Sequence, residues 1–397
     1  MAQKISVGID MGSTVIKVIV VESPKENGKH KPKVIGVGYA HSEGMRHGYI
    51  VNPEETAKSL RQAVSQAQKT SGYRIEKGFF AVGGAGLEGV TESVLISFGE
   101  KEITVSQNDI DQALEECQNE LPASNTRNRE IIHSIPLSFK IDGKAIYGKP
   151  QGMVASSLEV KTFFVTALSQ HLSSILATAR HAGLEIEDIV ASPIAASVAL
   201  LSKSQQIAGC GLLIIGGETS SFSIFENGVP IAVDVTPIGS RDITNDIALG
   251  FKVSLEEAER IKISRLESLP YPRRKIEEVV KARLEDVCDF VSSVLKKNGR
   301  QGLLPAGILV TGGGAQGHYI EELAKEKLKL PVKRIGIKFD GESKVALSDS
   351  TWSIAYGLAI IGAEGRGDGG IIDSLRGGGM FSSLARSISR FFRKILP

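Results

Sequence analysis

Apolar runs alternate along the chain with amphipathic, helix-forming segments. β-Branched residues dominate Ile5–Ile9 and Val15–Val21, which favours two buried strands over a helix. Pro53–Thr70 has helix composition with few breakers, and Phe79–Val82 predicts a further apolar strand. Strands that alternate with helices in this way predict an α/β fold class.

From about residue 86 to residue 165 the pattern changes. Strand-like segments at Val90–Phe98, Ile131–Ile135 and Leu137–Ile141 surround a helical segment at Gln107–Glu120. This mixture predicts a small inserted α+β subdomain.

The rest of the chain is richer in predicted helices. We expect helices at Thr166–Ala182, Arg273–Lys297 and Tyr319–Leu328, and an apolar helix at Trp352–Ile361 that closes the first domain. Ile308–Val310 predicts a buried strand between them.

The turn between the first two strands has the chemistry of a phosphate clamp. Gly12 lets the backbone approach an anion, and Ser13 and Thr14 can donate hydrogen bonds to it. Asp10 is placed to hold a hydrated Mg²⁺, and Lys17 offers a charge partner for phosphate. Taken alone, the stretch is also compatible with an ordinary hairpin closed by a glycine turn.

A second stretch of the same kind follows downstream. Cys210–Phe225 reads as a strand, a turn with Gly216 and Gly217, a hydroxyl cluster that includes Thr219, and another strand. Two such hairpins roughly 200 residues apart indicate an internal duplication. Duplicated halves that face each other would place both turns on one nucleotide phosphate chain.

Length and composition narrow the class of protein. The 397 residues are too many for one small core and predict two or more domains. Three distant cysteines and no signal-peptide pattern predict a location in the cytoplasm or on the inner face of the membrane. An aromatic content of 6% gives no support to nucleic-acid binding.

The C-terminal segment carries a distinct charge pattern. From Arg376 onward there are five basic residues and no acidic one, after a glycine-rich stretch at 364–379 that predicts a flexible linker. Residues 380–397 have apolar positions at helical spacing opposite a basic side, which predicts a reversible membrane-surface helix that many assembled copies would anchor firmly. Packing of this helix on the protein body is the alternative. The predicted membrane-binding residues are Phe381, Leu384, Ile388, Phe391, Phe392 and Ile395 on the apolar side, and Arg386, Arg390, Arg393 and Lys394 on the basic side.

Together these motifs resemble the actin superfamily, and within it the FtsA family of bacterial cell-division proteins, over essentially the whole chain. IDMGSTVIK looks like the first phosphate loop of the family, and EAERIK and ILVTGGGAQ look like its adenosine-binding elements. The resemblance implies ATP and Mg²⁺ as cofactors, with Glu259 and Lys262 at the adenosine and Gly312, Gly313 and Gly314 against the base.

The resemblance also implies a two-lobed actin-like fold of duplicated ribonuclease-H-like domains. The implied parts are a first lobe at 1–85, 166–206 and 352–363, an inserted subdomain at 86–165, a second lobe at 207–238 and 300–351, and a charged helical subdomain at 239–299.

The implied function is structural. The protein would form actin-like filaments on the cytoplasmic membrane at the division site, bind the C-terminal peptide of FtsZ, and recruit later division membrane proteins through the insert. Arg273, Arg274, Lys275 and Arg283 are candidates for pairing with the acidic FtsZ peptide, and a solvated helix face is the alternative for each.

One departure from the family pattern bears on catalysis. The family's second loop reads like DIGGGTTD, whereas this chain has Ile214 at the first acidic position, Glu218 for a glycine and Ser221 for a second Asp. Isoleucine cannot accept a hydrogen bond from the attacking water, so we expect very slow hydrolysis and at most a weak ATPase. Two roles stay open for Glu218: replacing the missing acid, or weakening nucleotide affinity through its charge.

Two other members of the superfamily are alternatives. A small-molecule kinase is disfavoured because Ile214 removes the acidic group expected for phosphoryl transfer. A PilM-like pilus-assembly protein relies on a membrane-protein partner for anchoring, so an autonomous basic amphipathic tail favours FtsA.

Overall fold

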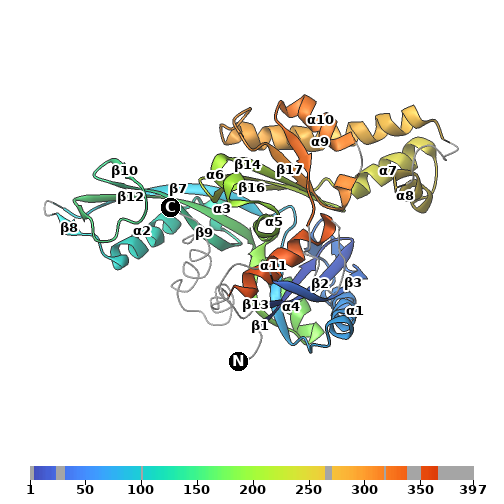
Figure 1. The fold of residues 1–397 in the computed structure, drawn as a ribbon, viewed down its shortest axis with the longest axis horizontal. Coiled ribbons are helices and arrows are strands. Elements are labelled where there is room, and N and C mark those ends of the chain that lie inside the picture. The colour runs from blue at the N-terminus through green and yellow to red at the C-terminus, as the bar shows by residue number, and fades with distance from the viewer. Residues whose placement is uncertain are drawn as a thin grey trace.

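The computed structural model describes residues 4–23, 32–99, 102–263, 271–316, 319–337 and 350–364. Two β-sheets organise these residues into two lobes, and an arm extends from them to the left of Figure 1. The predicted linker at 364–379, apart from Glu364, and the predicted helix at 380–397 lie outside the described residues. No described helix is both long and apolar enough to cross a membrane.

The first lobe contains a five-stranded sheet in the order β13-β6-β1-β2-β3. β1 and β2 form an antiparallel hairpin, while β6 pairs in parallel with both β1 and β13. The strands are β1 (Lys4–Met11), β2 (Val15–Ser23), β3 (Lys33–His41), β6 (Lys77–Val82) and β13 (Glu185–Ala191), with the short pair β4 (Met45–Arg46) and β5 (Tyr49–Ile50) beside them. The helices of this lobe are α1 (Pro53–Ser71), α4 (Ser169–Ala182), α5 (Ser192–Leu200) and α11 (Ser353–Ala363). Helix α6 (Lys203–Ala208) follows α5 and contacts the second lobe at β15 (Ser220–Glu226).

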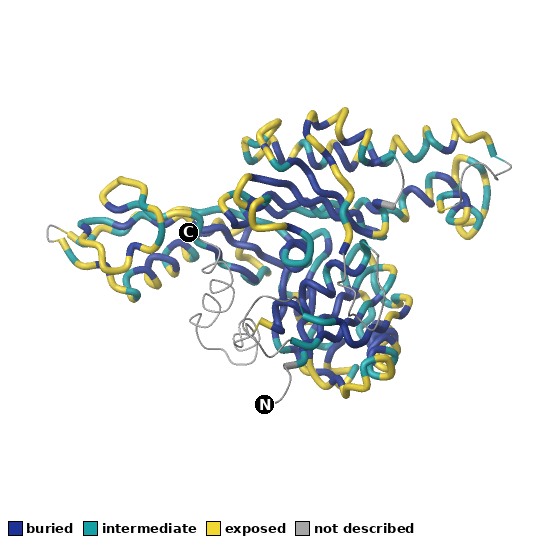
Figure 2. The backbone as a smooth tube through the Cα atoms, in the orientation of Figure 1, coloured by how far each residue is buried: buried dark blue, intermediate teal, exposed yellow. Residues whose placement is uncertain are grey.

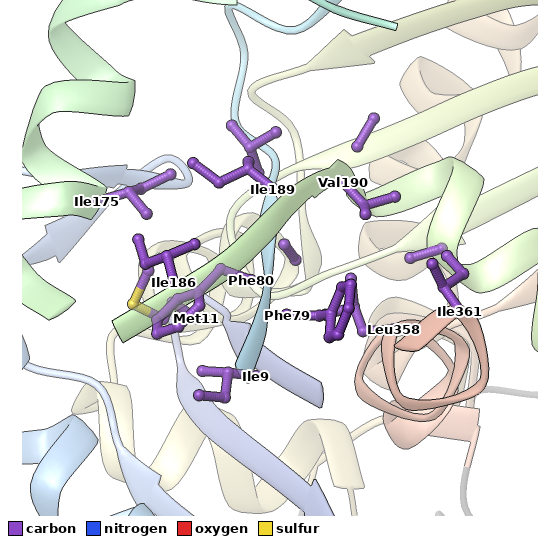
Figure 3. Close-up of a cluster of buried hydrophobic side chains, with 14 of the residues drawn as sticks. Ile9, Met11, Phe79, Phe80, Ile175, Ile186, Ile189, Val190, Leu358 and Ile361 are labelled. Atoms are coloured by element: carbon purple, nitrogen blue, oxygen red, sulfur yellow. The ribbon is translucent and has the colours of Figure 1, made fainter. Parts of the chain in front are cut away.

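Successive residues of β1 point to opposite faces of the sheet. Val7 and Ile9 join the main core cluster, which contains residues of α1, α4 and α11 and part of which Figure 3 shows around Phe79 and Phe80. Gly8 faces the other way, where a side chain would collide with the backbone of α11 at Ala355. Glycine in this strand therefore allows the apolar helix α11 to pack directly on the sheet.

The second lobe and the insert share one nine-stranded sheet, in the order β10-β9-β12-β7-β16-β15-β14-β17-β18. The link between the two parts is the pairing of Asp234 on β16 with Glu88 on β7. The lobe contributes β14 (Cys210–Ile215), β15 (Ser220–Glu226), β16 (Val229–Thr236), β17 (Ile308–Thr311) and β18 (Val332–Arg334). Its helices are α7 (Ser240–Phe251), α8 (Leu255–Ile263), α9 (Arg273–Lys297) and α10 (Tyr319–Leu328), with 3-10 turns at Gly313–Gln316 and Ser350–Trp352.

The insert forms the arm, whose outer end is largely exposed, whereas the sheets at the centre of the molecule are buried (Figure 2). Its helix α2 begins with a capping box between Ser106 and Asp109. The elements are β7 (Glu88–Ser97), β8 (Ile103–Thr104), α2 (Gln107–Asn119), α3 (Ala123–Thr126), β9 (Arg129–Ile141), β10 (Lys144–Ile146), β11 (Val154–Ala155) and β12 (Ser157–Leu168).

Two elements differ from the sequence-based expectation. β12 continues to Leu168, so the helix expected from Thr166 begins at Ser169. The two short strands expected at 131–135 and 137–141 are one strand, β9. Pairing between β12 and β9 explains both differences. Residues 166–168 of β12 pair with residues 129–131 of β9, which extends β12 to Leu168. Residues 161–163 of β12 pair with Ser138, Pro136 and Ile135 through a register shift, which joins the two expected segments of β9.

Candidate functional site

A cavity of about 1040 Å³ lies between the two lobes. The turns of the β1–β2 and β14–β15 hairpins line it, together with α8 and the glycines after β17. The structure brings every residue predicted to bind nucleotide to this one cavity: Asp10, Gly12, Ser13, Thr14, Lys17, Gly216, Gly217, Thr219, Glu259, Lys262, Gly312, Gly313 and Gly314.

The β1–β2 hairpin sets the geometry of the first turn. Asp10 and Lys17 are directly opposite each other in its register. Burial raises the pKa of the Asp10 carboxyl, and the charge of Lys17 offsets part of that rise. The Ser13 hydroxyl accepts a hydrogen bond from the Gly48 amide at 2.8 Å, which orients the oxygen and leaves its proton able to donate into the cavity.

The β14–β15 hairpin is anchored on the start of α7. The amide of Ser240 donates to the Gly216 carbonyl at 2.9 Å, and the amide of Arg241 donates to the Gly217 carbonyl at 2.7 Å. Any side chain at Gly217 would collide with the Thr14 hydroxyl of the first turn. The two turns therefore meet across the cavity, close enough to bind a single phosphate chain.

Ile214 and Glu218 have different surroundings. Ile214 lines the cavity at the end of β14 and presents only hydrocarbon to it. Glu218 is not among the lining residues, because its carboxylate forms an ion pair with Arg241 and accepts the backbone amide hydrogen of His47 at 2.6 Å. Both partners of the carboxylate, Arg241 and His47, are likewise absent from the residues that line the cavity.

Helix α8 presents Glu259 and Lys262 on one face, where they form an ion pair of 2.7 Å. Thr244 donates to the Glu259 carboxylate at 2.6 Å, and Lys262 donates to the Ser240 carbonyl at 3.1 Å. Burial opposes ionisation of Glu259, but the hydrogen bonds from Lys262 and Thr244 and the nearby positive charges lower its pKa overall. An ionised carboxylate beside an ammonium group can bind the hydroxyls of a ribose from both sides.

The glycines after β17 expose bare backbone at the cavity wall. Gly312 has a φ of 98°, which favours glycine, and a side chain there would collide with the backbone of Ile215. Gly313 and Gly314 continue along the cavity wall. A flat aromatic base can therefore approach the backbone closely at this point.

Sequence reasoning missed several lining residues, of which His171 is the most informative. Its ring packs edge-on against Tyr49 with centroids 5.0 Å apart, and burial lowers its pKa to about 4. Ser192 and Pro193, at the start of α5, also line the cavity. No spacing in the sequence links these residues to the two turns, because tertiary packing alone brings them together.

The four basic residues considered for peptide binding lie on α9 and all have partners within the described part of the chain. Arg273 also lines the cavity. The partners are Glu277 at 2.7 Å for Arg273, Glu278 at 3.0 Å for Arg274, the Phe251 ring at 5.3 Å for Lys275, and Asp246 at 2.8 Å for Arg283. The helix thus presents alternating charges rather than a purely basic surface. The ten predicted membrane-binding residues lie outside the described residues.

Comparisons with known proteins agree with this architecture. The profile of the family described as "Cell division protein FtsA" matches residues 212–357, and that of "SHS2 domain inserted in FTSA" matches residues 84–166. The cell division protein FtsA of Bacillus subtilis (strain 168) is 31% identical over 350 residues, which cover 82% of this chain and 77% of that protein. The chain belongs to the FtsA family of cell division proteins. The FtsA of Pseudomonas aeruginosa is 28% identical over 389 residues, which cover 92% of this chain and 91% of the relative.

Solved structures confirm an actin-like fold for this FtsA-family protein. The PilM-PilN type IV pilus biogenesis complex matches with a TM-score of 0.67 and 17% identity, covering 90% of this chain and 98% of that chain. MreB5 of Spiroplasma citri bound to ADP matches with a TM-score of 0.52 and 13% identity, covering 90% and 96% respectively. The predicted fold class, a two-lobed actin-like α/β fold with an inserted subdomain, is therefore confirmed, and the insert is an SHS2 domain.

Proposed function

We propose that this FtsA-family protein binds ATP with Mg²⁺ in the interlobe cavity and acts mainly as a structural and recruiting protein in cell division. The observation that supports nucleotide binding is the convergence of both glycine turns, the Glu259–Lys262 pair and the Gly312–Gly314 wall on one cavity. A relative of the same fold, MreB5, has been solved bound to ADP.

Mg²⁺ fits the donor set at the first turn. Asp10 supplies one buried carboxylate beside the hydroxyls of Ser13 and Thr14. A single carboxylate suits an ion that keeps most of its water ligands and bridges phosphate oxygens. Within the described residues, Asp10 would hold the ion and Lys17 would balance the phosphate charge.

The set of acidic residues at the cavity supports the proposal of slow hydrolysis. Among the described residues that line it, the acids are Asp10 and Glu259, and Glu259 is already bonded to Lys262 and Thr244. Ile214 offers no acceptor for an attacking water. We therefore expect an ATP-binding protein with at most weak ATPase activity.

A binding assay tests the site directly. Isothermal titration with ATP and Mg²⁺ should show one site per chain, and Lys262→Ala should weaken it at least about tenfold by removing a charged donor. Lys297→Ala is the matched control, because Lys297 pairs with Asp234 at 3.5 Å and is not among the lining residues. The proposal would be overturned if the unchanged chain binds no ATP at millimolar concentration, or if Lys262→Ala and Lys297→Ala lose the same affinity for ATP.

The remaining proposals concern assembly and partners. We infer filaments on the inner face of the cell membrane at the division site, held there by residues 380–397 through anionic lipids. FtsZ would bind through its C-terminal peptide to the helical subdomain at 239–299, and later division membrane proteins would bind the insert at 86–165. Family membership supports these roles and favours them over a pilus-assembly or kinase role.

Liposome sedimentation tests the membrane proposal. Full-length protein should pellet with vesicles of anionic lipid, whereas a chain without residues 381–397 should stay in the supernatant. A quadruple variant with Arg386, Arg390, Arg393 and Lys394 changed to Gln should pellet less strongly, because each basic residue contributes about 1 kcal/mol near an anionic surface. Unchanged sedimentation of the truncated chain would place the membrane contact elsewhere.

A further inference from the structure

The turn between β4 and β5 contacts both glycine turns that line the cavity. We call these two turns, at 12–14 and 216–219, the phosphate turns. His47 and Gly48 form this turn with positive φ angles of 48° and 80°. The amide of Gly48 donates to the Ser13 hydroxyl in the first lobe, whereas the amide of His47 donates to the Glu218 carboxylate in the second lobe. Two consecutive amides thus connect the lobes at the phosphate end of the cleft.

Glu218 is the second-lobe half of this connection. Its side chain is 8% exposed, and one carboxylate oxygen accepts from His47 while the other is paired with Arg241. The Arg241 side chain is 57% exposed, so water solvates the arginine and the arginine neutralises the buried carboxylate. The Nδ1 atom of His47 also lies 3.4 Å from the Glu218 carbonyl oxygen.

We propose that Glu218 is a positioning residue that latches the two lobes across the phosphate end of the cleft and thereby slows the exit of a bound nucleotide. The proposal rests on the nucleotide-binding role proposed above. Separation of the lobes would release a nucleotide held by both turns, and the same separation would break the hydrogen bond between His47 and Glu218. The residue that replaces a family glycine is therefore a conformational contact rather than a substitute catalytic acid.

The direction in which Glu218→Gln changes the rate of nucleotide dissociation distinguishes the latch from simple charge repulsion. If the Glu218 carboxylate acted by repelling phosphate, Glu218→Gln would slow nucleotide dissociation. If it latches the lobes, the same variant places an amide against Arg241, weakens the contact and speeds dissociation. Loss of one buried charged hydrogen bond corresponds to roughly a tenfold change in rate.

Stopped-flow displacement of fluorescent mant-ADP from the full chain measures this rate. We expect Glu218→Gln to release the nucleotide about tenfold faster than the unchanged chain. Glu226→Gln is the matched control, because Glu226 pairs with Arg300 at 2.7 Å inside the second lobe and should leave the rate unchanged. Arg241→Ala, at an exposed side chain, should act in the same direction as Glu218→Gln by a smaller factor. An unchanged or slower rate in Glu218→Gln would overturn the latch.

A second measurement requires no nucleotide. Spin labels at Lys58→Cys on α1 and Lys325→Cys on α10 report the interlobe distance, while the native cysteines are buried. In the nucleotide-free protein, Glu218→Gln should broaden or lengthen the distance distribution, and Glu226→Gln should not. Identical distributions would refute the latch. If the unchanged chain binds no nucleotide, the proposed function fails, and this distance alone decides the latch.

Discussion

Replacing Ile214 by aspartate tests why hydrolysis should be slow. Ile214 is the penultimate residue of β14, where it pairs with Ser221 on β15 and Thr311 on β17, and the residue is 7% exposed at the cavity wall. Ile214→Asp would place a hydrogen-bond acceptor beside the phosphate turns without changing either turn. We expect phosphate release to rise at least about tenfold, because positioned acids of this kind contribute factors of 10²–10⁴ when the rest of the site is in place. Ser221 still occupies the position of the second family acid, so the full factor is not expected.

The same substitution has a stability cost that must be separated from its catalytic effect. Ile214 packs in a cluster with Leu212, Phe225 and Leu309, and removing its side chain should lower the free energy of unfolding by about 3 kcal/mol. Ile214→Asn carries a similar cost without the carboxylate and is the matched control. The assay is steady-state phosphate release with saturating ATP and Mg²⁺, with folding checked by chemical denaturation. If Ile214→Asp is folded and binds ATP but releases phosphate no faster than Ile214→Asn, the missing acid at position 214 is not the reason for slow hydrolysis.

Three further predictions concern stability. Arg129→Ala removes hydrogen bonds to the Thr166 hydroxyl at 2.9 Å and the Gly86 carbonyl at 2.6 Å at the base of the insert. It should lower the free energy of unfolding by about 3 kcal/mol in urea titrations, and a change below about 1 kcal/mol would contradict this role. Burial lowers the pKa of His133 from 6.5 to about 3 in the folded chain. As the pH drops, the histidine is therefore protonated in the unfolded chain before it is protonated in the folded chain. The free energy of unfolding should fall between pH 6.5 and about 3. Chemical denaturation at several pH values gives the free energy of unfolding as a function of pH. Between pH 6.5 and about 3, the slope of this plot should be smaller by the equivalent of about one proton in His133→Gln. An unchanged slope would exclude His133 as the cause of the pH dependence. Gly8→Ala should lower the melting temperature by several degrees, because its methyl group collides with the backbone of α11 at Ala355, and an unchanged melting temperature would refute this contact.

The sequence by itself determined the chemistry of the two turns. Asp10, Gly12 and Lys17 belong to one short hairpin, so turn chemistry and strand periodicity were enough to predict their proximity. Helices α9 and α10 begin and end at the predicted residues, because their amphipathic spacing and flanking breakers are also local signals. Local signals of this kind depend on neighbours within a few residues and are visible without a structure.

Only the tertiary structure decided how distant segments pair. The extension of β12 to Leu168 and the single strand β9 depend on each other, because each supplies the hydrogen bonds of the other. The insert joins the sheet of the second lobe through Glu88 and Asp234, residues that no sequence pattern connects. Strand pairing over such separations is set by packing of the whole domain, so propensity alone could not predict it.

Glu218 shows most clearly the difference between what the sequence predicts and what the tertiary structure determines. From the sequence, its carboxylate had two open roles, both at the phosphates. In the folded chain it contacts His47, 171 residues away, and Arg241, 23 residues away, and both contacts lie outside the cavity. A buried carboxylate is stable only with such partners, and only folding determines which side chains and amides reach it.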